Sequence, residues 1–335
     1  MKLKKKLLST VMLSTAALLA LAGCGSKESG SASYSIAISQ IVEHPSLDAT
    51  REGFLKALED AGIKAGDNLK VDVNIAQGDS TNNLSIAQKI ASGKYDLALG
   101  IATPSALTLA QNVKDFPVLF AAVTDPLADK VVSSLEKPGA NVTGASDTNP
   151  EAIVRLMDFI ASDFPNVKNV GIVINEGESN AVIMAKKAEE ALSAHGIKLV
   201  RAAATTSSEV KQAAESLIGR ADAIYITLDN TVVTAADSII QVANDNKLPF
   251  FSSDRDTVEK GAFATVGFKY YDHGYQVGQM AVDVLKNGKK PADMPVSVPD
   301  KLDLILNLKA AEAQGIDVTD AMKDKVKDKE NNIIQ

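Results

Sequence analysis

The chain has 335 residues, 42 of them acidic and 35 basic, and its formal net charge of −7 argues against nucleic acid as a partner. Its single cysteine, Cys24, excludes an intramolecular disulfide, so stability must come from a hydrophobic core. The length is enough for two domains of roughly 100–150 residues each. Aromatic residues make up only 4% of the chain, which leaves Ala, Val, Ile and Leu as core formers, as in parallel sheets covered by helices.

The first 33 residues have the pattern of an export signal followed by a linker. A lysine-rich start precedes a mostly apolar run over 7–21, and small residues then lead to Cys24. We therefore expect a signal peptide over 1–23 and a flexible, Ser/Gly-rich linker over 24–33.

The string Leu-Ala-Gly-Cys over 21–24 resembles the bacterial lipobox, whose cysteine is lipidated and becomes the first mature residue. A buried or reactive thiol and a transmembrane anchor are the other interpretations. The uncharged run over 7–26 is barely long enough to span a bilayer and contains Ser and Thr, which favours a cleaved signal. Loss of the signal would leave 31 basic and 42 acidic residues, a net charge of −11. The lipid would therefore have to hold this acidic protein to the extracytoplasmic face of the cell membrane.

After residue 33, short apolar runs alternate with helical patterns. In the first helical segment, Phe54, Leu55 and Leu58 recur at helical spacing. The order βαβαβαβ predicts a parallel, doubly wound sheet with right-handed crossovers. The expected strands are 34–42, 69–76, 95–101 and 117–123, and the expected helices are 47–62, 84–91 and 106–112.

The same alternation starts again after residue 150, which predicts a second unit of similar architecture. Its expected strands are 169–175, 197–203, 223–228 and 248–252, and its helices are 153–164, 180–195, 209–219 and 234–246. A third section has an expected strand over 263–268, a helix over 270–287, extended segments over 294–298 and 302–308, and a short helix over 310–314.

We expect an α/β fold with two doubly wound parallel-sheet lobes, joined by a three-strand hinge and separated by a cleft. The lone strand and helix after residue 262 are expected to complete the first sheet. The chain should then cross between lobes near 144–149, 252–254 and 289–295. This assigns 34–145 plus 254–290 to the first lobe and 146–253 plus 291–335 to the second.

Ligands of open parallel sheets bind beyond the carboxyl ends of the strands. In the first lobe, His44 and Asp48 follow the first strand, although a His before Pro in a turn is often simply solvated. Thr103 and Ser105 follow the third strand, where Thr103 is expected to cap a helix whose N-terminus attracts an anion. Thr124 follows the fourth strand, and Thr103 and Thr124 together form a candidate cradle for a carboxylate.

Two acids, Asp229 and Asp254, follow strands of the second unit. A partly buried carboxylate needs a charged partner, which a ligand ammonium would supply, although either acid could instead cap a helix. An anion cradle in one lobe and carboxylates in the other point to a zwitterion such as an amino acid. The remaining candidate ligand-binding residues are Ser146, Asp147, Ser179, Asn180 and Asn230.

Motifs of catalysis are missing from the sequence. There is no phosphate-binding glycine loop, no G-x-S-x-G elbow and no H-E-x-x-H motif. The three histidines, His44, His195 and His273, are scattered without metal-ligand spacing. A lipidated Cys24 could not act as a nucleophile. We therefore expect no enzyme activity, no cofactor and no metal.

Six stretches, spread from the first strand to the last helix, resemble the solute-binding lipoproteins of ABC transporters with the type I periplasmic-binding-protein fold. The likeness is strongest to the tryptophan/tyrosine-type subfamily. The stretches are Gln-Ile-Val-Glu-His-Pro-Ser-Leu-Asp over 40–48, Ala-Thr-Pro over 102–104, Val-Thr-Asp-Pro over 123–126, Thr-Gly-Ala-Ser-Asp over 143–147, Leu-Asp-Asn over 228–230 and Asn-Leu-Lys-Ala-Ala over 307–311.

This resemblance implies a monomer whose hinged cleft closes on a small solute and then docks on a permease driven by an ATPase. The solute class it implies is an amino acid, and the subfamily points to an aromatic one. It also implies that Thr103 and Thr124 hold the ligand carboxylate and that Asp229 holds the ammonium. A surface adhesin and a ligand-sensing receptor subunit remain alternatives on the same scaffold.

Overall fold

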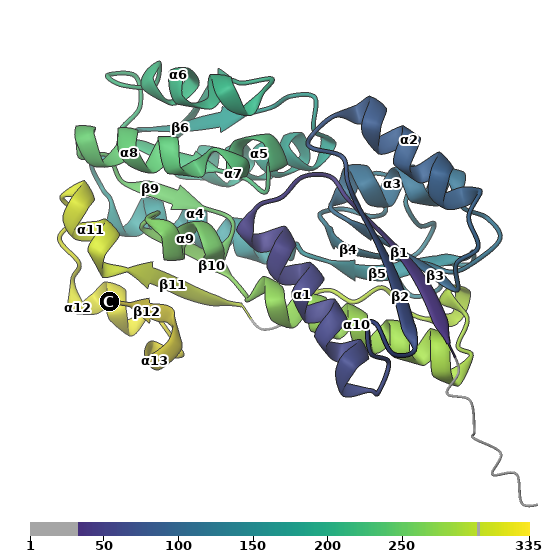
Figure 1. Ribbon diagram of the computed structural model, residues 1–335. Helices are drawn as coiled ribbons and strands as arrows, with labels where there is room; N and C mark the ends of the chain where they lie inside the picture. Colours follow the sequence, from purple (N-terminus) through teal and green to yellow (C-terminus); the bar gives the residue numbers. More distant parts are fainter. Residues whose placement is uncertain (1–32, 300–301) are drawn as a thin grey trace, which may run out of the picture. The chain divides into compact units, whose positions relative to one another are not determined.

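The computed structural model describes residues 33–299 and 302–335, which form two sheets with their covering helices (Figure 1). The predicted signal peptide, Cys24 and nearly all of the predicted linker lie outside the described residues. In the part of the chain that is described, no helix combines the length and apolar character needed to cross a membrane.

The first sheet has five parallel strands in the order β2-β1-β3-β4-β5. Every residue of β3, β4 and β5 is buried, as expected for apolar strands covered on both faces. The strands are β1 (Tyr34–Gln40), β2 (Leu69–Ile75), β3 (Leu97–Ile101), β4 (Val118–Val123) and β5 (Val142–Ser146). β5 was not predicted, because Thr143, Gly144 and Ser146 give it little of the apolar character on which strand prediction depends.

Four helices complete the first lobe: α1 (Pro45–Asp60), α2 (Ser80–Ala91), α3 (Thr103–Asn112) and α10 (Tyr270–Asn287). α10 packs along α1 with almost no space between the two backbones. A Cβ atom on Gly274 would lie 1.9 Å from the Thr50 carbonyl oxygen, and one on Gly53 would lie 2.0 Å from the Tyr271 carbonyl oxygen. These glycines therefore fix α10 to the first lobe, although it follows most of the second lobe in sequence.

The second sheet has seven strands in the order β12-β11-β10-β9-β8-β6-β7, and only the β10–β11 pair is antiparallel. These strands are β6 (Asn169–Ile174), β7 (Lys198–Ala203), β8 (Ala223–Ile226), β9 (Phe250–Ser252), β10 (Ala264–Gly267), β11 (Asp303–Asn307) and β12 (Ile333–Ile334). The two mostly parallel sheets confirm the predicted α/β fold class.

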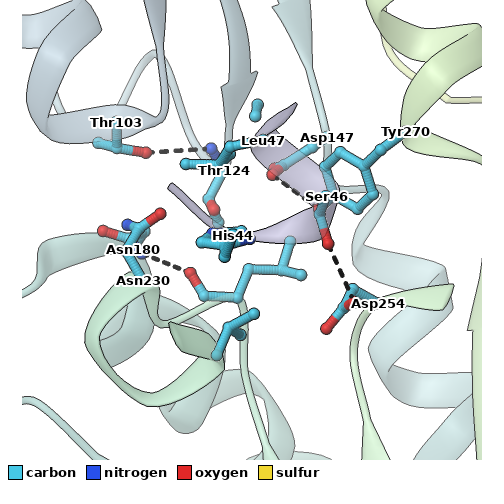
Figure 2. A pocket seen from close by; sticks show the side chains of 13 residues that line it. His44, Ser46, Leu47, Thr103, Thr124, Asp147, Asn180, Asn230, Asp254 and Tyr270 are labelled. Carbon is cyan, nitrogen blue, oxygen red and sulfur yellow. Dashed lines mark hydrogen bonds between the residues drawn. The ribbon is translucent and has the colours of Figure 1, made fainter. Parts of the chain in front are cut away.

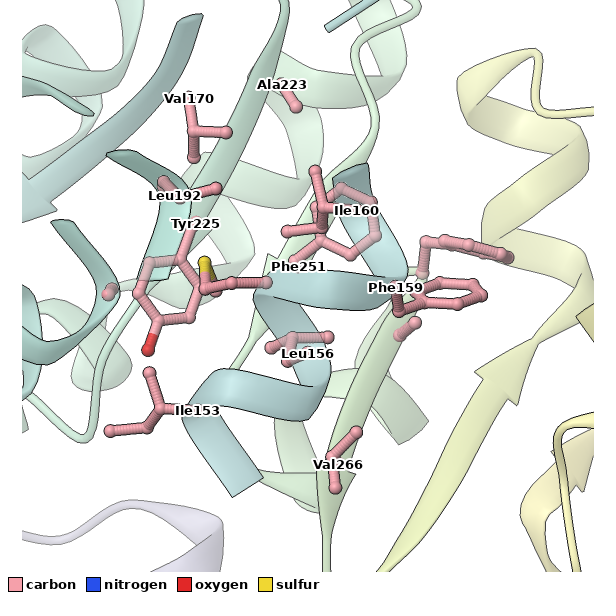
Figure 3. Close-up of a cluster of buried hydrophobic side chains, with 14 of the residues drawn as sticks. Ile153, Leu156, Phe159, Ile160, Val170, Leu192, Ala223, Tyr225, Phe251 and Val266 are labelled. Carbon is pink, nitrogen blue, oxygen red and sulfur yellow. The ribbon is translucent and has the colours of Figure 1, made fainter. Parts of the chain in front are cut away.

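The helices of the second lobe are α4 (Pro150–Asp163), α5 (Ser179–Ala194), α6 (Val210–Glu215), α7 (Asn230–Thr234), α8 (Ala236–Asn246), α9 (Arg255–Lys260), α11 (Leu308–Gln314), α12 (Asp320–Asp324) and α13 (Lys329–Asn332), with short 3₁₀ turns at Ser207–Glu209 and, beside the first lobe, Pro291–Asp293. One face of the sheet packs on α4 through a cluster of aromatic rings. Phe159 stacks on Phe263 with 6.3 Å between ring centroids, and Phe251 lies edge-on to Phe159 with 6.5 Å between centroids. Figure 3 shows Phe159 and Phe251 among the buried side chains of this face. Such pairs add stability beyond their buried area.

The predicted lobe boundaries need two corrections. Residues 254–290 were assigned to the first lobe, but β10 pairs with β9 and β11 in the second sheet, so only α10 returns to the first lobe. Residues 291–335 were assigned to the second lobe, but 291–297 stays with the first, where the Thr143 hydroxyl donates to the Met294 carbonyl at 2.7 Å. The strand expected over 294–298 is a single bridge between Ala145 and Ser297.

These corrections follow from local complementarity. β10 has a parallel partner, β9, immediately beside it, whereas the glycines of α10 pack directly against α1. The chain therefore passes between the sheets after β5, after β10 and after Ser297. The number of connections is three, as predicted, but the second and the third lie later in the chain than the predicted 252–254 and 289–295.

Candidate ligand-binding cleft

A small cavity of about 20 Å³ lies where α1, α3, β4 and α10 of the first lobe face α5, α7 and α9 of the second. In Figure 2, Thr103 and Thr124 lie toward one end of it and Ser46 and Asp254 toward the other. Its lining residues are His44, Ser46, Leu47, Thr103, Ala122, Thr124, Asp147, Asn180, Leu228, Asn230, Val233, Asp254 and Tyr270. Seven of the predicted residues are therefore brought together here.

The Thr103–Thr124 pair lies at the carboxyl ends of β3 and β4, as predicted. The Thr103 hydroxyl accepts a hydrogen bond from the Thr124 backbone N–H at 3.3 Å, and both residues are buried. Thr103 was expected as the N-cap of α3, but Ala102 occupies that position with φ of 75°, and no side chain caps the helix. The N-terminus of α3 therefore keeps first-turn N–H groups without a side-chain cap beside the cavity, which favours an anion there.

Asp147 lies just beyond β5, with 6% of its surface exposed. Its carboxylate accepts hydrogen bonds from the Thr148 hydroxyl at 3.0 Å and the Tyr270 hydroxyl at 3.1 Å. Burial raises the pKa of Asp147 to about 6, against the lowering effect of these hydroxyls and of Thr124. No cation lies among these partners, so a positively charged ligand group would find an uncompensated carboxylate here.

Two buried polar atoms that line the cavity have no hydrogen-bond partner. They are Nδ1 of His44 and Oδ1 of Asn180. Burial lowers the pKa of His44, although the Asp254 charge opposes this shift, so the imidazole is neutral at pH 7. Since buried polar groups almost always have partners, these two atoms mark positions where a ligand would supply the missing bonds.

Glu178, which was not predicted, holds the second-lobe side of the cavity in place. Its carboxylate accepts from the backbone and side-chain nitrogens of Asn230 at 2.9 and 2.7 Å. It also accepts from the backbone N–H and hydroxyl of Thr231 at 2.9 and 2.8 Å. Asn180 completes the group by donating to the Leu228 carbonyl at 2.7 Å. In the sequence, Glu178 lies in a polar run and resembles a solvated loop residue.

One hydrogen bond joins the two lobes within the cavity wall: the Ser46 hydroxyl donates to Asp254 at 3.1 Å. Asp254 is also the N-cap of α9, because its carboxylate accepts from the Thr257 backbone N–H at 2.8 Å and from the Ser252 hydroxyl at 2.9 Å. Asp254 therefore caps α9 and also lines the cavity, where it can contact a ligand; the sequence left both roles as alternatives.

Asp229 does not line the cavity, and the prediction that it binds the ligand ammonium is corrected. It is fully buried as the N-cap of α7, where one carboxylate oxygen accepts from the Val232 N–H at 3.1 Å and the other from the Asn175 N–H at 2.6 Å. Its pKa is raised well above the ordinary range, first by burial and then by the nearby charge of Glu178. The helix-capping alternative therefore describes its role.

The other predicted residues outside the cavity have local partners. Asp48 pairs with Arg51 at 3.1 Å, and Ser105 donates to Asn83 at 3.0 Å. Ser146 donates to the Thr124 carbonyl at 3.1 Å and so supports the cavity wall from behind. Ser179 is exposed at the start of α5.

The apolar part of the lining was not predicted. Leu47, Leu228 and Val233 give the cavity a hydrophobic wall, and the Tyr270 ring lies 5.2 Å from Phe268. Sequence periodicity assigns such residues to the core, and only the lobe arrangement shows that they line a cavity. No lysine or arginine lines it, and the described residues hold no cluster of side chains suited to a metal ion.

Residues 35–329 match the model of a protein family described as ABC transporter substrate binding protein. The chain belongs to this family. A tyrosine-binding protein from Clostridioides difficile (strain R20291) is 39% identical over 324 residues, which cover 92% of this chain and 93% of that protein. A substrate-binding protein of this family is not an enzyme, and the fold is that of the type I periplasmic-binding proteins, as expected.

Two solved structures of relatives show which arrangement of the lobes this substrate-binding protein adopts. The ABC domain from Streptococcus pneumonia in complex with L-Trp is 31% identical with a TM-score of 0.84, covering 90% of this chain and 100% of that one. The ligand-free, open structure of a substrate binding protein with adhesive properties from Clostridium difficile is 39% identical, but its TM-score is 0.65, covering 90% and 98%. The lobes here are therefore arranged more as in the ligand complex than as in the open form.

Proposed function

We propose that this substrate-binding protein captures an aromatic amino acid, tyrosine or tryptophan, in the cavity between its lobes and delivers it to the permease of an ABC importer. The observation that carries the proposal is a buried, partly apolar cavity with carboxylates, unpaired polar atoms and no protein cation. The relatives named for tyrosine binding and solved with L-Trp support the aromatic class.

An amino acid fits the polar groups in one orientation. Its carboxylate would lie at the uncapped start of α3, held by Thr103 and Thr124. The ammonium of an amino acid is separated from the carboxylate by one carbon atom, so the protein group that binds the ammonium must lie beside Thr124. The Asp147 carboxylate lies there. Asp147 therefore replaces Asp229 as the proposed ammonium partner. The aromatic side chain would lie along Leu47, with its polar atoms within reach of the unpaired atoms of the lining.

Capture depends on closure because the proposed contacts come from both lobes. A ligand shifts the open and closed populations only by its differential affinity for the two states. Asn180 and Asn230 belong to the second lobe, whereas Thr103, Thr124 and Asp147 adjoin the first. Only the closed form can therefore offer all of these contacts at once, and it would present a distinct surface to the permease.

The proposal is tested by isothermal titration of the purified protein with L-tyrosine and L-tryptophan. D-tyrosine serves as the matched control, because it exchanges the positions of the ammonium and the side chain. We expect saturable binding of at least one L-enantiomer and much weaker binding of D-tyrosine. Binding of neither L-amino acid would contradict the proposed ligand class.

We also propose that the protein is an extracytoplasmic lipoprotein held to the membrane through Cys24. The support is the lipobox-like string before Cys24 and the acidic composition of the remaining chain. Cys24→Ala should release the protein from the membrane fraction into the medium or periplasm. Retention of this variant on the membrane would refute the lipid anchor.

Adhesion is a second candidate function, favoured by the adhesive properties stated for the relative from Clostridium difficile. An adhesive surface would act independently of the cavity. Adhesion by the protein should then be unchanged by Asp147→Asn, which is expected to impair amino-acid capture. Loss of adhesion in that variant would argue against an independent adhesive surface.

A further inference from the structure

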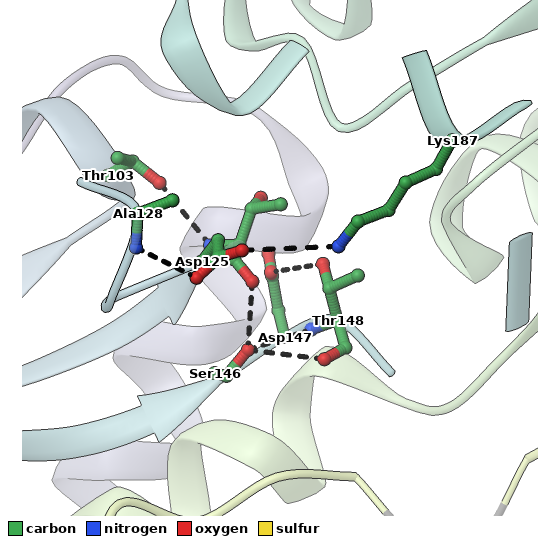
Figure 4. A network of polar contacts seen from close by, with 8 residues as sticks. Thr103, Asp125, Ala128, Ser146, Asp147, Thr148 and Lys187 are labelled. Carbon is green, nitrogen blue, oxygen red and sulfur yellow. Dashed lines mark hydrogen bonds and ion pairs between the residues drawn. The ribbon is translucent and has the colours of Figure 1, made fainter. Parts of the chain in front are cut away.

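A second connection between the lobes lies outside the ligand cavity. Asp125 follows Thr124 on the loop after β4, in the first lobe, and Lys187 lies on α5, in the second. The Lys187 Nζ atom is 4.0 Å from a carboxylate oxygen of Asp125, as Figure 4 shows. Neither residue lines the cavity.

The loop after β4 presents Asp125 to α5 in a fixed position. The other carboxylate oxygen of Asp125 accepts from the Ala128 N–H at 3.0 Å, and its carbonyl accepts from the Asp129 N–H at 3.1 Å. These bonds form a turn, so the side chain keeps one oxygen free to face Lys187. Lys187 and Asp125 side chains are each 30% exposed, which leaves their attraction only partly screened by water.

The same loop carries a second acid toward α5. Burial raises the pKa of Asp129, the Ser179 hydroxyl opposes this shift and the Asp125 charge adds to it. Ser179 is the first residue of α5, so the acidic loop of the first lobe faces the positive end of a second-lobe helix as well as its lysine. The charges on the two surfaces are complementary across the cleft.

We propose that Asp125 and Lys187 form a latch that stabilises the closed arrangement and thereby raises ligand affinity without touching the ligand. This inference rests on the proposed function, because the ligand whose affinity the latch raises is the amino acid bound in the cavity. A contact that exists only when the lobes close adds to the stability of the closed state alone, and so slows ligand release. Asp125 and Lys187 are positioning residues, which act through the lobe arrangement.

The expected effect is modest because the pair is partly exposed. Exposed ion pairs contribute about 0.2–1 kcal/mol, which corresponds to roughly a 1.4- to 5-fold change in affinity. The effect should act mainly on the dissociation rate, and it should fade as the salt concentration rises.

The test is a double-mutant cycle on the purified protein, measured by titration with L-tyrosine and by stopped-flow release. Asp125→Asn keeps an oxygen for the Ala128 N–H but removes the charge, and Lys187→Met keeps the apolar stem. Lys186→Met, one position earlier on α5 and exposed, is the matched control. We expect each single variant to release ligand about 1.4- to 5-fold faster, the double variant to be no worse than either single one, and the control to be unchanged.

Additive losses in the double variant, or singles that match wild type at low salt, would overturn the latch. Small-angle X-ray scattering of the ligand-free proteins at low salt tests the latch without a ligand. It therefore distinguishes an incorrect latch from an incorrect choice of ligand. If L-tyrosine and L-tryptophan do not bind, the latch still predicts that Asp125→Asn and Lys187→Met have a larger mean radius of gyration than wild type and Lys186→Met. Equal radii in all of these proteins would then overturn it.

Discussion

Asp147→Asn tests the proposed ammonium site, because it removes the charge while keeping the shape of the side chain. Burial raises the pKa of the wild-type carboxyl from the ordinary 3.8 to about 6. Each pKa unit corresponds to 1.36 kcal/mol, so ionised Asp147 costs the empty, folded protein about 3 kcal/mol. With only 6% of the residue exposed, solvent screening reduces this figure little. A ligand ammonium would relieve this cost on binding.

The variant should therefore bind its amino acid much more weakly. A hydrogen bond to a charged group contributes about 1.5–3 kcal/mol, so we expect the Kd for L-tyrosine to rise roughly 10- to 150-fold. The ligand-free variant should not be less stable at pH 7. The raised pKa means that the folded protein binds this proton more tightly than the unfolded chain, so wild-type stability from this group increases as pH falls through 6 toward 4 and is lost as pH rises.

The pH dependence of binding gives the sharper assay. Because the ammonium needs ionised Asp147, the wild-type Kd should be about tenfold higher at pH 5 than at pH 7, for a pKa of about 6. The Kd of Asp147→Asn should stay nearly constant over that range. Asp48→Asn, which lies outside the cavity, should behave as wild type. A variant that binds as tightly as wild type, or that keeps the same pH dependence, would refute this role for Asp147.

Three further predictions concern stability and the corrected site. Gly274→Ala should lower the free energy of unfolding by more than about 2 kcal/mol, and with it the melting temperature, because its Cβ would lie 1.9 Å from a carbonyl oxygen. Gly267→Ala is the control, because its Cβ would lie 3.8 Å from the nearest atom and should leave the melting temperature nearly unchanged. Equal melting curves for the two variants would contradict the helix packing. Asp229→Ala should cost about 1–3 kcal/mol of unfolding free energy, measured by urea denaturation, while changing the ligand Kd less than threefold; the reverse pattern would restore Asp229 as a ligand contact. Burial lowers the pKa of His273 to about 4, so the wild type should lose stability relative to His273→Gln as pH falls from 6.5 to 4, and parallel pH profiles would show that His273 is not buried neutral.

The sequence was enough to predict the fold class and most elements, because apolar runs and helical spacing are local properties. The helix at 270–287 was predicted with its observed bounds. The sequence did not reveal that α10 packs in the first lobe while β10, the strand before it, pairs in the second sheet. It depends on Gly53 meeting Tyr271 and Gly274 meeting Thr50, and these contacts join residues more than 200 positions apart.

Site residues could be predicted where they directly follow a strand of a parallel sheet. They could not be predicted where their role depends on which other side chains or backbone groups they contact. His44, Thr103 and Thr124 were found because each follows a strand of a parallel sheet. Asp229 follows a strand in the same way, but two backbone N–H groups occupy its carboxylate, and nothing in its neighbouring sequence distinguishes it from Asp254. The apolar lining could not be separated from the core by periodicity, because both have the same spacing.

A crystal structure of the protein grown with L-tyrosine or L-tryptophan tests the central claim most directly. We predict density for the amino acid between the lobes, with its ammonium within about 3 Å of the Asp147 carboxylate and its carboxylate beside Thr103 and Thr124. Density at another surface, or an amino acid in this cavity with its ammonium turned away from Asp147, would contradict the account.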